Sequence, residues 1–235
     1  FELASPILAA AFVQALMLSA IFILLPLLAG NTAQGGTGLT ARTCGYFFSI
    51  GLAFLFIEIA FIQKFILFLS HPLYAVTVVL AGFLFFAGLG SSFASYLVRH
   101  EKDAFISFGI TSASAISFST IGITVISFCY LWFLPEFFAN FTALFDIWRI
   151  FITLSLIAPL AFFMGLPFPL ALARLDNLAP RLIPWAWAVN GCASVVSAIL
   201  ATLLAMEIGF ALLLALACLL YLCSGFLFIP KKPSV

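Results

Sequence analysis

The stretch CGYFFSIGLAFLFIEIAFIQKFILF, residues 44–68, decides the fold class of this chain. It is apolar almost throughout, and its charged residues are Glu58 and Lys64. A helix needs about 20 apolar residues to cross the hydrocarbon of a bilayer, and this stretch is longer. It also lacks the alternation of apolar and polar residues that a transmembrane β-strand requires. The stretch therefore predicts a membrane-spanning α-helix.

The composition extends this prediction to the whole chain. Of its 235 residues, 66% are hydrophobic and 7% are charged, whereas about a quarter of the residues of a soluble domain are charged. This excludes a soluble globular protein, because too few polar side chains remain to cover a water-facing surface. The net charge of +1 provides no basic field for nucleic acid. The expected partner is the lipid bilayer, and no nucleic acid is expected.

Seven apolar runs of spanning length follow one another. They cover residues 6–29, 44–68, 72–97, 105–133, 145–165, 184–206 and 209–229, the last two separated by a turn at 207–209. Since only helices or closed barrels satisfy backbone polar groups in lipid, we expect an all-α, polytopic integral membrane bundle of about seven transmembrane helices. Residues 1–43 would hold the first helix and a Gly/Thr-rich linker. Residues 44–229 would form a six-helix membrane bundle, with three-plus-three as a candidate organisation, and 230–235 a cytoplasmic tail.

Lysine and arginine are distributed unequally between the two sets of alternate loops. One side carries Lys64 and Arg149, and the other carries seven such residues: Arg42, Arg99, Lys102, Arg174, Arg181, Lys231 and Lys232. Cytoplasmic loops carry the excess of positive charge in membrane proteins. We therefore predict a multi-pass protein of the plasma membrane, the bacterial inner membrane, with its N-terminus outside and its C-terminus in the cytoplasm.

Glu58 is the ionisable residue that lies deep inside a predicted span. An ionised side chain at the centre of a membrane costs about 2.5–3.5 kcal/mol on insertion scales, so it needs a partner or a task. Lys64 falls about 120° away from Glu58 around a helix of 3.6 residues per turn, so the two do not face each other as an i,i+4 pair would. We expect Glu58 to be protonated, bonded to another helix or facing a wet cavity. A proton or cation site and a structural hydrogen bond are the two alternatives.

Three further polar residues belong to the candidate intramembrane site. Gln63 follows Glu58 in the same span, and His71 precedes Pro72 where the second span turns into the third. Asn190, in the sixth span, has both a donor and an acceptor and is a candidate partner for Glu58. For His71, capping or hydrogen bonding by a neutral ring is favoured over a role as a metal or pigment ligand.

Small residues mark two predicted helix-packing faces. The third span ends with Gly88 and Gly90, and the sixth carries Gly191, Ser194 and Ala198 at helical spacing. Small residues let helix backbones approach closely in lipid, where no hydrophobic force drives helices together. We therefore expect tight helix pairing at both faces.

Closely spaced prolines interrupt the fifth span near its end. The run Gly165-Leu166-Pro167-Phe168-Pro169 lacks two amide donors and obstructs the carbonyls of the preceding turn. We expect the helix to break there, and the amphipathic run at 170–176 to lie at the cytoplasmic interface. Broken helices are tolerated where the backbone is buried in protein or lines a cavity. The break therefore marks either a site or a sharp exit from the membrane, and the exit is favoured.

No metal site, cofactor or catalytic residue is predicted. The five cysteines show neither a CxxC spacing nor a Cys/His pairing, and most lie inside apolar runs, which favours a role in packing. A bound lipid is compatible with so apolar a chain. A pigment is the less favoured ligand.

Several motifs occur in a fixed order: GLAFLFIEIA (51–60), LSHP (69–72), GLGS (88–91), GLPFPL (165–170) and PWAWAVNG (184–191). Together they resemble the C-terminal membrane region of bacterial membrane-fused spermidine-synthase-like proteins, over about residues 44–229. In that family a soluble aminopropyltransferase-like domain with a nucleotide cofactor precedes these helices. This chain shows no glycine-rich strand-turn-helix fingerprint, so the resemblance implies the membrane region without the catalytic domain. It also implies that Glu58, Gln63, His71, the 165–169 break and Asn190 occupy signature positions.

Two functional hypotheses follow. The first is a non-catalytic integral membrane subunit or domain that anchors or assembles with a larger membrane complex, with other membrane protein subunits as partners. The alternative is a transporter or transporter half for a proton, cation or polyamine, which uses Glu58 and the hydroxyl-rich fourth span. An enzyme has the least support, because Glu136 and Asp146 have no base or nucleophile spaced beside them.

Overall fold

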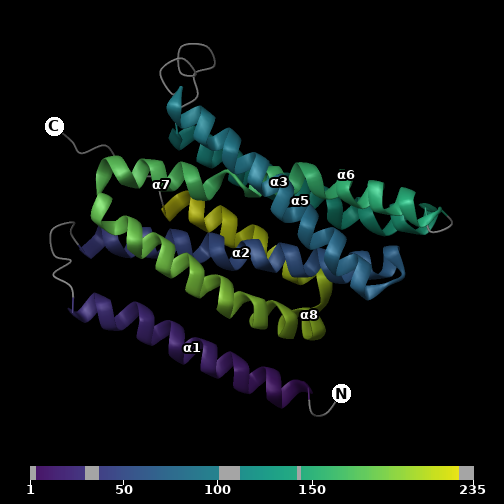
Figure 1. Cartoon of the computed structure of the whole chain (residues 1–235), viewed down its shortest axis with the longest axis horizontal. Helices are drawn as coiled ribbons and strands as arrows, with labels where there is room; N and C mark the ends of the chain where they lie inside the picture. The colour runs from purple at the N-terminus through teal and green to yellow at the C-terminus, as the bar shows by residue number, and fades with distance from the viewer. Residues whose placement is uncertain (1–3, 30–36, 101–111, 142–143, 228–235) are drawn as a thin grey trace.

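The computed structural model describes residues 4–29, 37–100, 112–141 and 144–227. Within these ranges all regular structure is helical: α1 (Ala4–Ala29), α2 (Thr37–Leu69), α3 (Pro72–Arg99), α5 (Ser112–Phe141), α6 (Asp146–Met164), α7 (Pro167–Leu178), the 3₁₀ turn η2 (Pro180–Leu182) and α8 (Ile183–Leu227). The long helices run back and forth along an elongated bundle (Figure 1). The predicted all-α class is confirmed for this part of the chain.

Five helical segments of the described chain are long and apolar enough to cross a membrane: Gly38–Leu69, Pro72–Arg99, Ser114–Phe141, Asp146–Leu178 and Pro180–Leu227. α1 adds a shorter apolar stretch, Leu8–Ile21. α8 turns back on itself at Gly209 (Figure 1), where φ is 73° and ψ is 178°. That conformation is open essentially to glycine alone. The length and composition of these segments support the predicted multi-pass helical membrane protein, and the number of seven spans stays a prediction.

The start of α2 differs from the sequence prediction. α2 begins at Thr37, so residues 37–40, predicted as the end of a flexible linker, are helical. Leu39 packs against the core, and this tertiary contact supports an extra helical turn that the glycine content argues against. The rest of the predicted linker, 30–36, and the predicted tail, 230–235, lie outside the described residues.

The end of α5 also differs from the predicted boundary at 133. The helix continues to Phe141 and contains Pro135. Phe138 explains the extension, because its ring stacks on that of Phe68 at 4.5 Å between centroids and meets that of Phe65 at 5.1 Å. Aromatic pairs in such arrangements add about 0.5–1.5 kcal/mol beyond the area that they bury. Residues 105–111 of the predicted fourth span lie outside the described residues.

α2 is the central helix of the bundle. The ring of Phe61 lies 5.6 Å from that of Phe83 on α3, 5.9 Å from that of Tyr130 on α5 and 6.0 Å from that of Phe210 on α8. One α2 side chain thus contacts three neighbouring helices. The abundant phenylalanines therefore fill the interior of the bundle as well as its outer surface.

α1 lies along α8 at the edge of the bundle (Figure 1). Its described side chains show one buried residue, Ala15, while Val13 and Met17 on either side are exposed. The small side chain at Ala15 suits close helix packing in lipid. The other faces of α1 are left for lipid or for another protein.

Several hydroxyl groups of α5 bond within the helix itself, whereas the buried Ser127 Oγ has no hydrogen-bond partner among the described residues. Ser119 Oγ donates to the carbonyl of Ile116, and Thr124 Oγ1 to that of Thr120, both at 2.8 Å. Such bonds satisfy a hydroxyl in an apolar environment without a partner helix. These hydroxyls of α5 therefore act in local structure, which weakens the prediction of a polar path along this helix.

The contact face of α8 is shifted from the row predicted at 191, 194 and 198. Gly191 is exposed, with open space where a Cβ would stand, whereas Ala193 and Ser197 are fully buried. Ser197 Oγ donates to the carbonyl of Leu52 on α2 at 2.8 Å. The face of α8 that contacts α2 is therefore decided by the burial of α2 side chains, and not by where the smallest residues of α8 lie. Ser194 and Ala198 are half-buried beside it.

α3 and α6 approach each other through a reciprocal pair of glycines. A Cβ on Gly90 would overlap the carbonyl of Phe162, and a Cβ on Gly165 would overlap that of Ala87. The two backbones therefore touch directly, as small residues permit in lipid. Gly88, predicted to pack in the same way, has open space around it instead.

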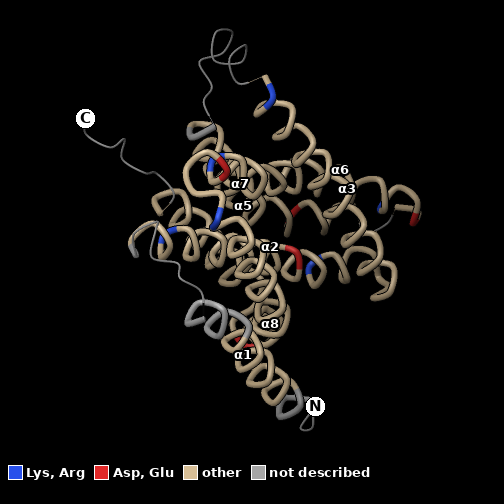
Figure 2. The backbone as a smooth tube through the Cα atoms, turned by 60° about the vertical axis from the view of Figure 1, so that its left-hand side comes forward, with Lys and Arg blue, Asp and Glu red and all other residues tan. Residues whose placement is uncertain are grey.

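Lysine and arginine gather mainly at the end of the bundle where the C-terminus lies (Figure 2). Arg42 is near the start of α2, Arg99 ends α3, and Arg174 and Arg181 lie in α7 and η2. Lys64 and Arg149 belong to the opposite end, with α6 beginning beside the α2–α3 turn. The charge division expected from the sequence thus corresponds to two physical ends of the bundle.

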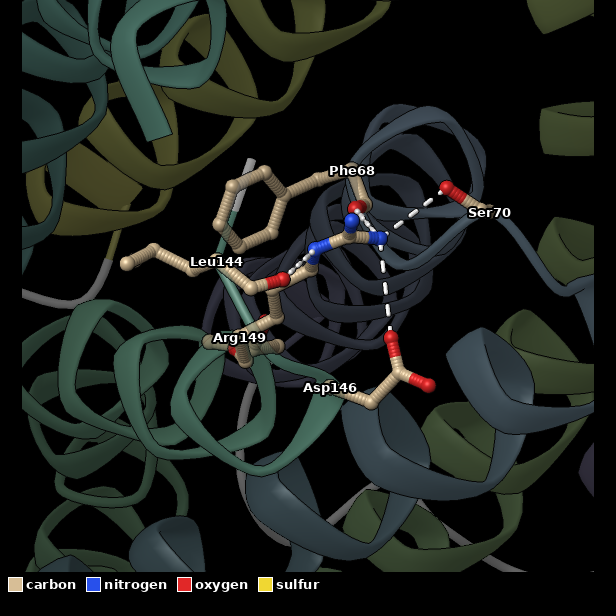
Figure 3. Close-up of polar contacts among 6 residues, drawn as sticks. Phe68, Ser70, Leu144, Asp146 and Arg149 are labelled. Atoms are coloured by element: carbon tan, nitrogen blue, oxygen red, sulfur yellow. Dashed lines mark hydrogen bonds and ion pairs between the residues drawn. The ribbon is translucent and has the colours of Figure 1, made fainter. Parts of the chain in front are cut away.

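Arg149 ties the α2–α3 turn to the start of α6 (Figure 3). Its Nη1 donates to Ser70 Oγ at 3.1 Å and to the Phe68 carbonyl at 3.4 Å, and its Nε donates to the Leu144 carbonyl at 3.0 Å. The Asp146 carboxylate is 3.7 Å from Nη1, but this side chain is 78% exposed against 15% for Arg149. A cation at the last carbonyls of α2 is favourable. The contacts with α2 and Leu144, more than the ion pair, hold this end together.

The close approach at the two glycines can be tested by adding one methyl group. We expect Gly90→Ala and Gly165→Ala each to destabilise the fold, because overpacking costs about 1–3 kcal/mol. Gly88→Ala and Gly191→Ala are matched controls, since a Cβ there meets nothing within 4 Å; alanine also favours a helix. Thermal unfolding in mild detergent measures the difference. A Gly90→Ala midpoint equal to that of Gly88→Ala would contradict the contact.

Arg149→Met should destabilise the fold more than Asp146→Asn does. The first change removes the donor from the partly buried carbonyl oxygens of Phe68 and Leu144, at about 0.5–1.5 kcal/mol for each hydrogen bond, whereas an exposed ion pair contributes about 0–1 kcal/mol. The Arg149 contact also holds Ser70 in its backbone conformation. The φ of Ser70 is 62°, a value that residues other than glycine rarely adopt. Chemical unfolding of both variants in detergent gives the comparison, and equal losses would assign the stability to the ion pair.

Candidate functional site

A cavity of about 400 Å³ lies where α2, α3, α8 and the α6–α7 break meet. Several residues predicted for separate roles line it together: Gly88, Gly165, Pro167, Pro169, Asn190 and Ser194. Most of the remaining lining is apolar, with Phe54, Leu84 and Phe168 as large members. Tertiary packing thus unites the break with residues predicted for packing and hydrogen bonding.

The break itself forms one wall of this cavity. α6 ends at Met164 and α7 begins at Pro167, where the missing amide donor is harmless because first-turn amides lack partners within a helix. Tyr46 of α2 is fully buried and its hydroxyl donates to the Pro167 carbonyl at 3.0 Å. The prolines therefore set the place of the break, and α2 fixes the position of its far side.

Pro159 does not interrupt α6, which remains helical on both sides of this residue. Tyr130 of α5 donates its hydroxyl to the carbonyl of Leu156 at 2.6 Å, one turn before this proline. A proline inside a helix removes one backbone hydrogen bond and displaces a carbonyl of the preceding turn. A hydrogen bond from the neighbouring helix at this level helps α6 to remain intact as far as Gly165.

Asn190 stands at the contact between α8 and α2. A Cβ on Gly51 would lie 2.9 Å from both the Asn190 carbonyl oxygen and its side-chain Oδ1. Ser194 Oγ donates to the Asn190 carbonyl at 2.9 Å. The Asn190 amide and Ser91 on α3 are polar groups in a mainly apolar lining. Such a lining, with few polar groups, is typical of a site for a small amphiphilic molecule.

Glu58 lies on the same side of α2 as Gly51, two turns further along. Its side chain is 4% exposed, and its Oε1 has no hydrogen-bond partner among the described residues. Gly51 and Glu58 are seven residues apart, which is about 10 Å along a helix. Asn190 packs against Gly51, so it is not the hydrogen-bond partner of Glu58 that the sequence suggested. Phe54 and Leu55 of the cavity lining lie one turn before Glu58. The unpartnered carboxyl is thus one helical turn beyond the cavity.

The other predicted polar residues lie away from this cavity. Gln63 is half-buried on α2, and the Lys64 Nζ stands 5.5 Å from the centre of the Phe210 ring. His71 is exposed before α3 and makes no capping bond through its side chain. It borders a second cavity of about 330 Å³ together with Asp146. In the described residues no three His, Cys, Asp or Glu side chains form a group that could hold a metal ion.

Most of the other lining residues were not singled out from the sequence, Gly51, Ser91 and Tyr221 among them. Gly51 lies seven residues before Glu58 and so shares its helix face, which is a usable signal. Ser91 follows Gly90 directly, but no pattern in the neighbouring sequence indicates that it lines a cavity. Phe168 is held by rings of two other helices, Phe47 at 5.3 Å and Trp187 at 4.7 Å.

Tyr46→Phe tests whether α2 fixes the break. We expect a loss of about 0.5–1.5 kcal/mol in stability, the net value of a typical hydrogen bond. Tyr74→Phe is the control, because Tyr74 is 61% exposed. Thermal unfolding in detergent compares the two variants. Equal stability of Tyr46→Phe and the wild type would show that the hydroxyl does not support α7.

No family model, curated protein or solved structure matches this chain. The resemblance to the membrane region of spermidine-synthase-like proteins stays a prediction. It is carried by the ordered motifs, four of which contribute lining residues of the cavity: GLAFLFIEIA, GLGS, GLPFPL and PWAWAVNG.

Proposed function

We propose that this chain is a transport-type membrane domain in which Glu58 carries a proton and the cavity beside the α6–α7 break receives the substrate. The observation that carries the proposal is the unpartnered Oε1 of Glu58, buried one helical turn beyond that cavity. Buried polar atoms normally have partners. Ionisable residues inside membranes are costly and mark proton or ion pathways.

The composition of the cavity wall supports an uncharged or weakly polar substrate. Its described lining residues include no charged side chain and offer Asn190 and Ser91 for hydrogen bonds. Its volume of about 400 Å³ falls in the range of about 300–1,000 Å³ usual for small-molecule sites. A polyamine carries several ammonium groups, and buried charges need partners. The lining therefore favours a proton at Glu58 over a polyamine in the cavity.

The broken helix supports the same role. Substrate sites of transporters are commonly formed by discontinuous helices, whose freed backbone groups face the ligand. Here Gly165 of the break belongs to the cavity wall, together with the prolines at 167 and 169. Of the two interpretations of the break that the sequence left open, this supports a site over a simple exit from the membrane.

Glu58 works as a proton carrier by alternating between two environments. An ionised carboxylate in a dry interior costs several kcal/mol, so the side chain holds its proton while Phe54 and Leu55 separate it from the cavity. Movement of these lining residues exposes the carboxyl and lets the proton leave. Asn190, in the cavity wall, then offers a hydrogen-bonding side chain on the cavity side of Phe54 and Leu55.

The placement in the membrane belongs to the same proposal. The domain crosses the bacterial inner membrane seven times, with α8 counted as two crossings that meet at Gly209. The arginine-rich end lies in the cytoplasm with the C-terminus, and the N-terminus lies outside. The resemblance to spermidine-synthase-like proteins is compatible with a membrane region of this kind.

The assembly hypothesis keeps one supporting feature, α1. This helix packs mainly on α8 and leaves exposed residues such as Leu16 and Met17. Exposed apolar side chains suit lipid and a partner subunit equally. They therefore favour neither role, whereas a buried unpartnered carboxyl has no purpose in a simple anchor.

Proton flux into proteoliposomes tests the role of Glu58. With a potassium gradient and valinomycin to impose a membrane potential, and a pH-sensitive dye inside, we expect Glu58→Gln to reduce flux to the level of empty liposomes. Glu58→Asp should retain part of it. Glu207→Gln is the matched control, because Glu207 is exposed. Flux in Glu58→Gln equal to that of Glu207→Gln would remove Glu58 from the mechanism.

The cavity is tested in the same vesicles. Gly88→Leu places a large side chain in the cavity, whereas Gly191→Leu adds the same atoms at an exposed place outside it; neither position has an atom near a new Cβ. We expect the first variant to slow proton flux and the second to leave it unchanged. Equal flux in the two variants would separate the cavity from the proton path.

A further inference from the structure

A third and smaller pocket, of about 190 Å³, opens at the arginine-rich end of the bundle. It is formed by three segments that are distant in sequence: the start of α2, the end of α7 and the end of α8. Its lining residues are Gly38, Leu39, Arg42, Thr43, Leu175, Leu178 and Leu227. The volume is below the range of about 300–1,000 Å³ of drug-sized sites. The pocket thus suits part of a larger molecule.

Thr43 contributes an unsatisfied polar atom to this pocket. Its residue is fully buried, and its Oγ1 has no hydrogen-bond partner among the described residues. A helical threonine usually returns this bond to a carbonyl of the preceding turn, as Thr124 does on α5. A buried hydroxyl without such a bond is available to a ligand in the pocket.

Arg42, on the adjacent position, supplies a positive charge. The side chain is exposed, and no ion pair joins it to another residue of the described chain. Gly38 and Leu39 of the same pocket lie in the first turn of α2, where amides without partners in the helix and the helix dipole favour an anion. Guanidinium groups bind phosphate through paired hydrogen bonds. This edge of the pocket is therefore built for an anionic oxygen group.

The rest of the pocket is hydrocarbon. Leu39, Leu175 and Leu178 form its walls together with Leu227 at the end of α8. A free phosphate ion would gain nothing from these leucines, whereas an acyl chain would bury against them. Anionic headgroup chemistry at one edge and hydrocarbon along the walls match one class of molecule in the surroundings of a membrane protein.

We propose that this pocket binds one anionic phospholipid, with its phosphate at Arg42 and Thr43 and the first part of an acyl chain along the leucines. The lipid joins the start of α2 to the ends of α7 and α8. It thereby covers the N-terminus of the central helix. The role is independent of the proton path, since Glu58 and the larger cavity share no lining residue with this pocket.

Lipid binding is measured on the full chain in mild detergent by native mass spectrometry and by thermal unfolding. Phosphatidylglycerol and phosphatidylcholine with identical acyl chains are the two probes. We expect phosphatidylglycerol to bind more tightly and to raise the unfolding midpoint more. Arg42→Gln should weaken this binding about fivefold, the equivalent of one basic residue at an anionic lipid. Arg99→Gln, at the same end of the bundle but outside the pocket, should bind as the wild type does.

Thr43→Val separates a ligand role from a structural one. Valine has the same shape and removes an unpartnered hydroxyl, so the lipid-free protein should be as stable as the wild type or more stable. The stabilisation by phosphatidylglycerol should nevertheless decrease. A structural role for Thr43 would instead lower the stability of the lipid-free protein and leave the lipid effect unchanged, which would overturn the assignment of Thr43.

Three results would overturn the lipid proposal as a whole. Equal binding of the two lipids would remove the anionic component. Equal weakening in Arg42→Gln and Arg99→Gln would indicate general surface charge instead of a site. Equal stabilisation by inorganic phosphate or by glycerophosphoglycerol, which lacks acyl chains, would identify a soluble anion as the ligand.

Discussion

At Gly90 and Gly165 the backbones of α3 and α6 touch, and the arrangement of the larger cavity depends on this contact. Neither position leaves room for a side chain, so the end of α6 is held against α3 at the level where the prolines interrupt it. The two neighbouring glycines Gly51 and Gly88 line the space beside this contact. The tight glycine contact therefore has an open volume beside it at Gly88, whereas Gly51 is itself packed closely against Asn190.

The need to satisfy polar groups in lipid explains much of the remaining structure. Tyr46, Tyr130 and Ser197 each donate to a carbonyl of another helix, close to the break, close to Pro159 and along the α2–α8 interface respectively. Hydrogen bonds of this kind replace the water that a soluble protein would use. Against this background three buried side-chain oxygens of the described residues have no hydrogen-bond partner: Thr43 Oγ1, Glu58 Oε1 and Ser127 Oγ. Glu58 is the ionisable residue among them.

Patterns that depend on local chemistry were predictable. The apolar runs placed most of the helices, Pro72 marked a helix start, the prolines at 167 and 169 marked the break after α6, and Gly209 marked the turn within α8. The errors occurred where tertiary contacts decide. The stacking of Phe138 on Phe68 extends α5 past its predicted end. The buried face of α8 is chosen by what α2 presents, so Ala193 and Ser197 replaced Gly191.

The sequence by itself determined that lipid is the solvent, that the fold is helical and that Glu58 is a costly residue, because composition, run length and proline chemistry act locally. It also named Asn190, Gly88 and the 165–169 break, but as unrelated features. Only the tertiary structure brought these together around one cavity and placed Glu58 beyond it without a partner. The physical reason is that the relative rotation of neighbouring helices is decided by side-chain packing across interfaces. Residues far apart in the sequence jointly determine that packing, and no single run reveals it.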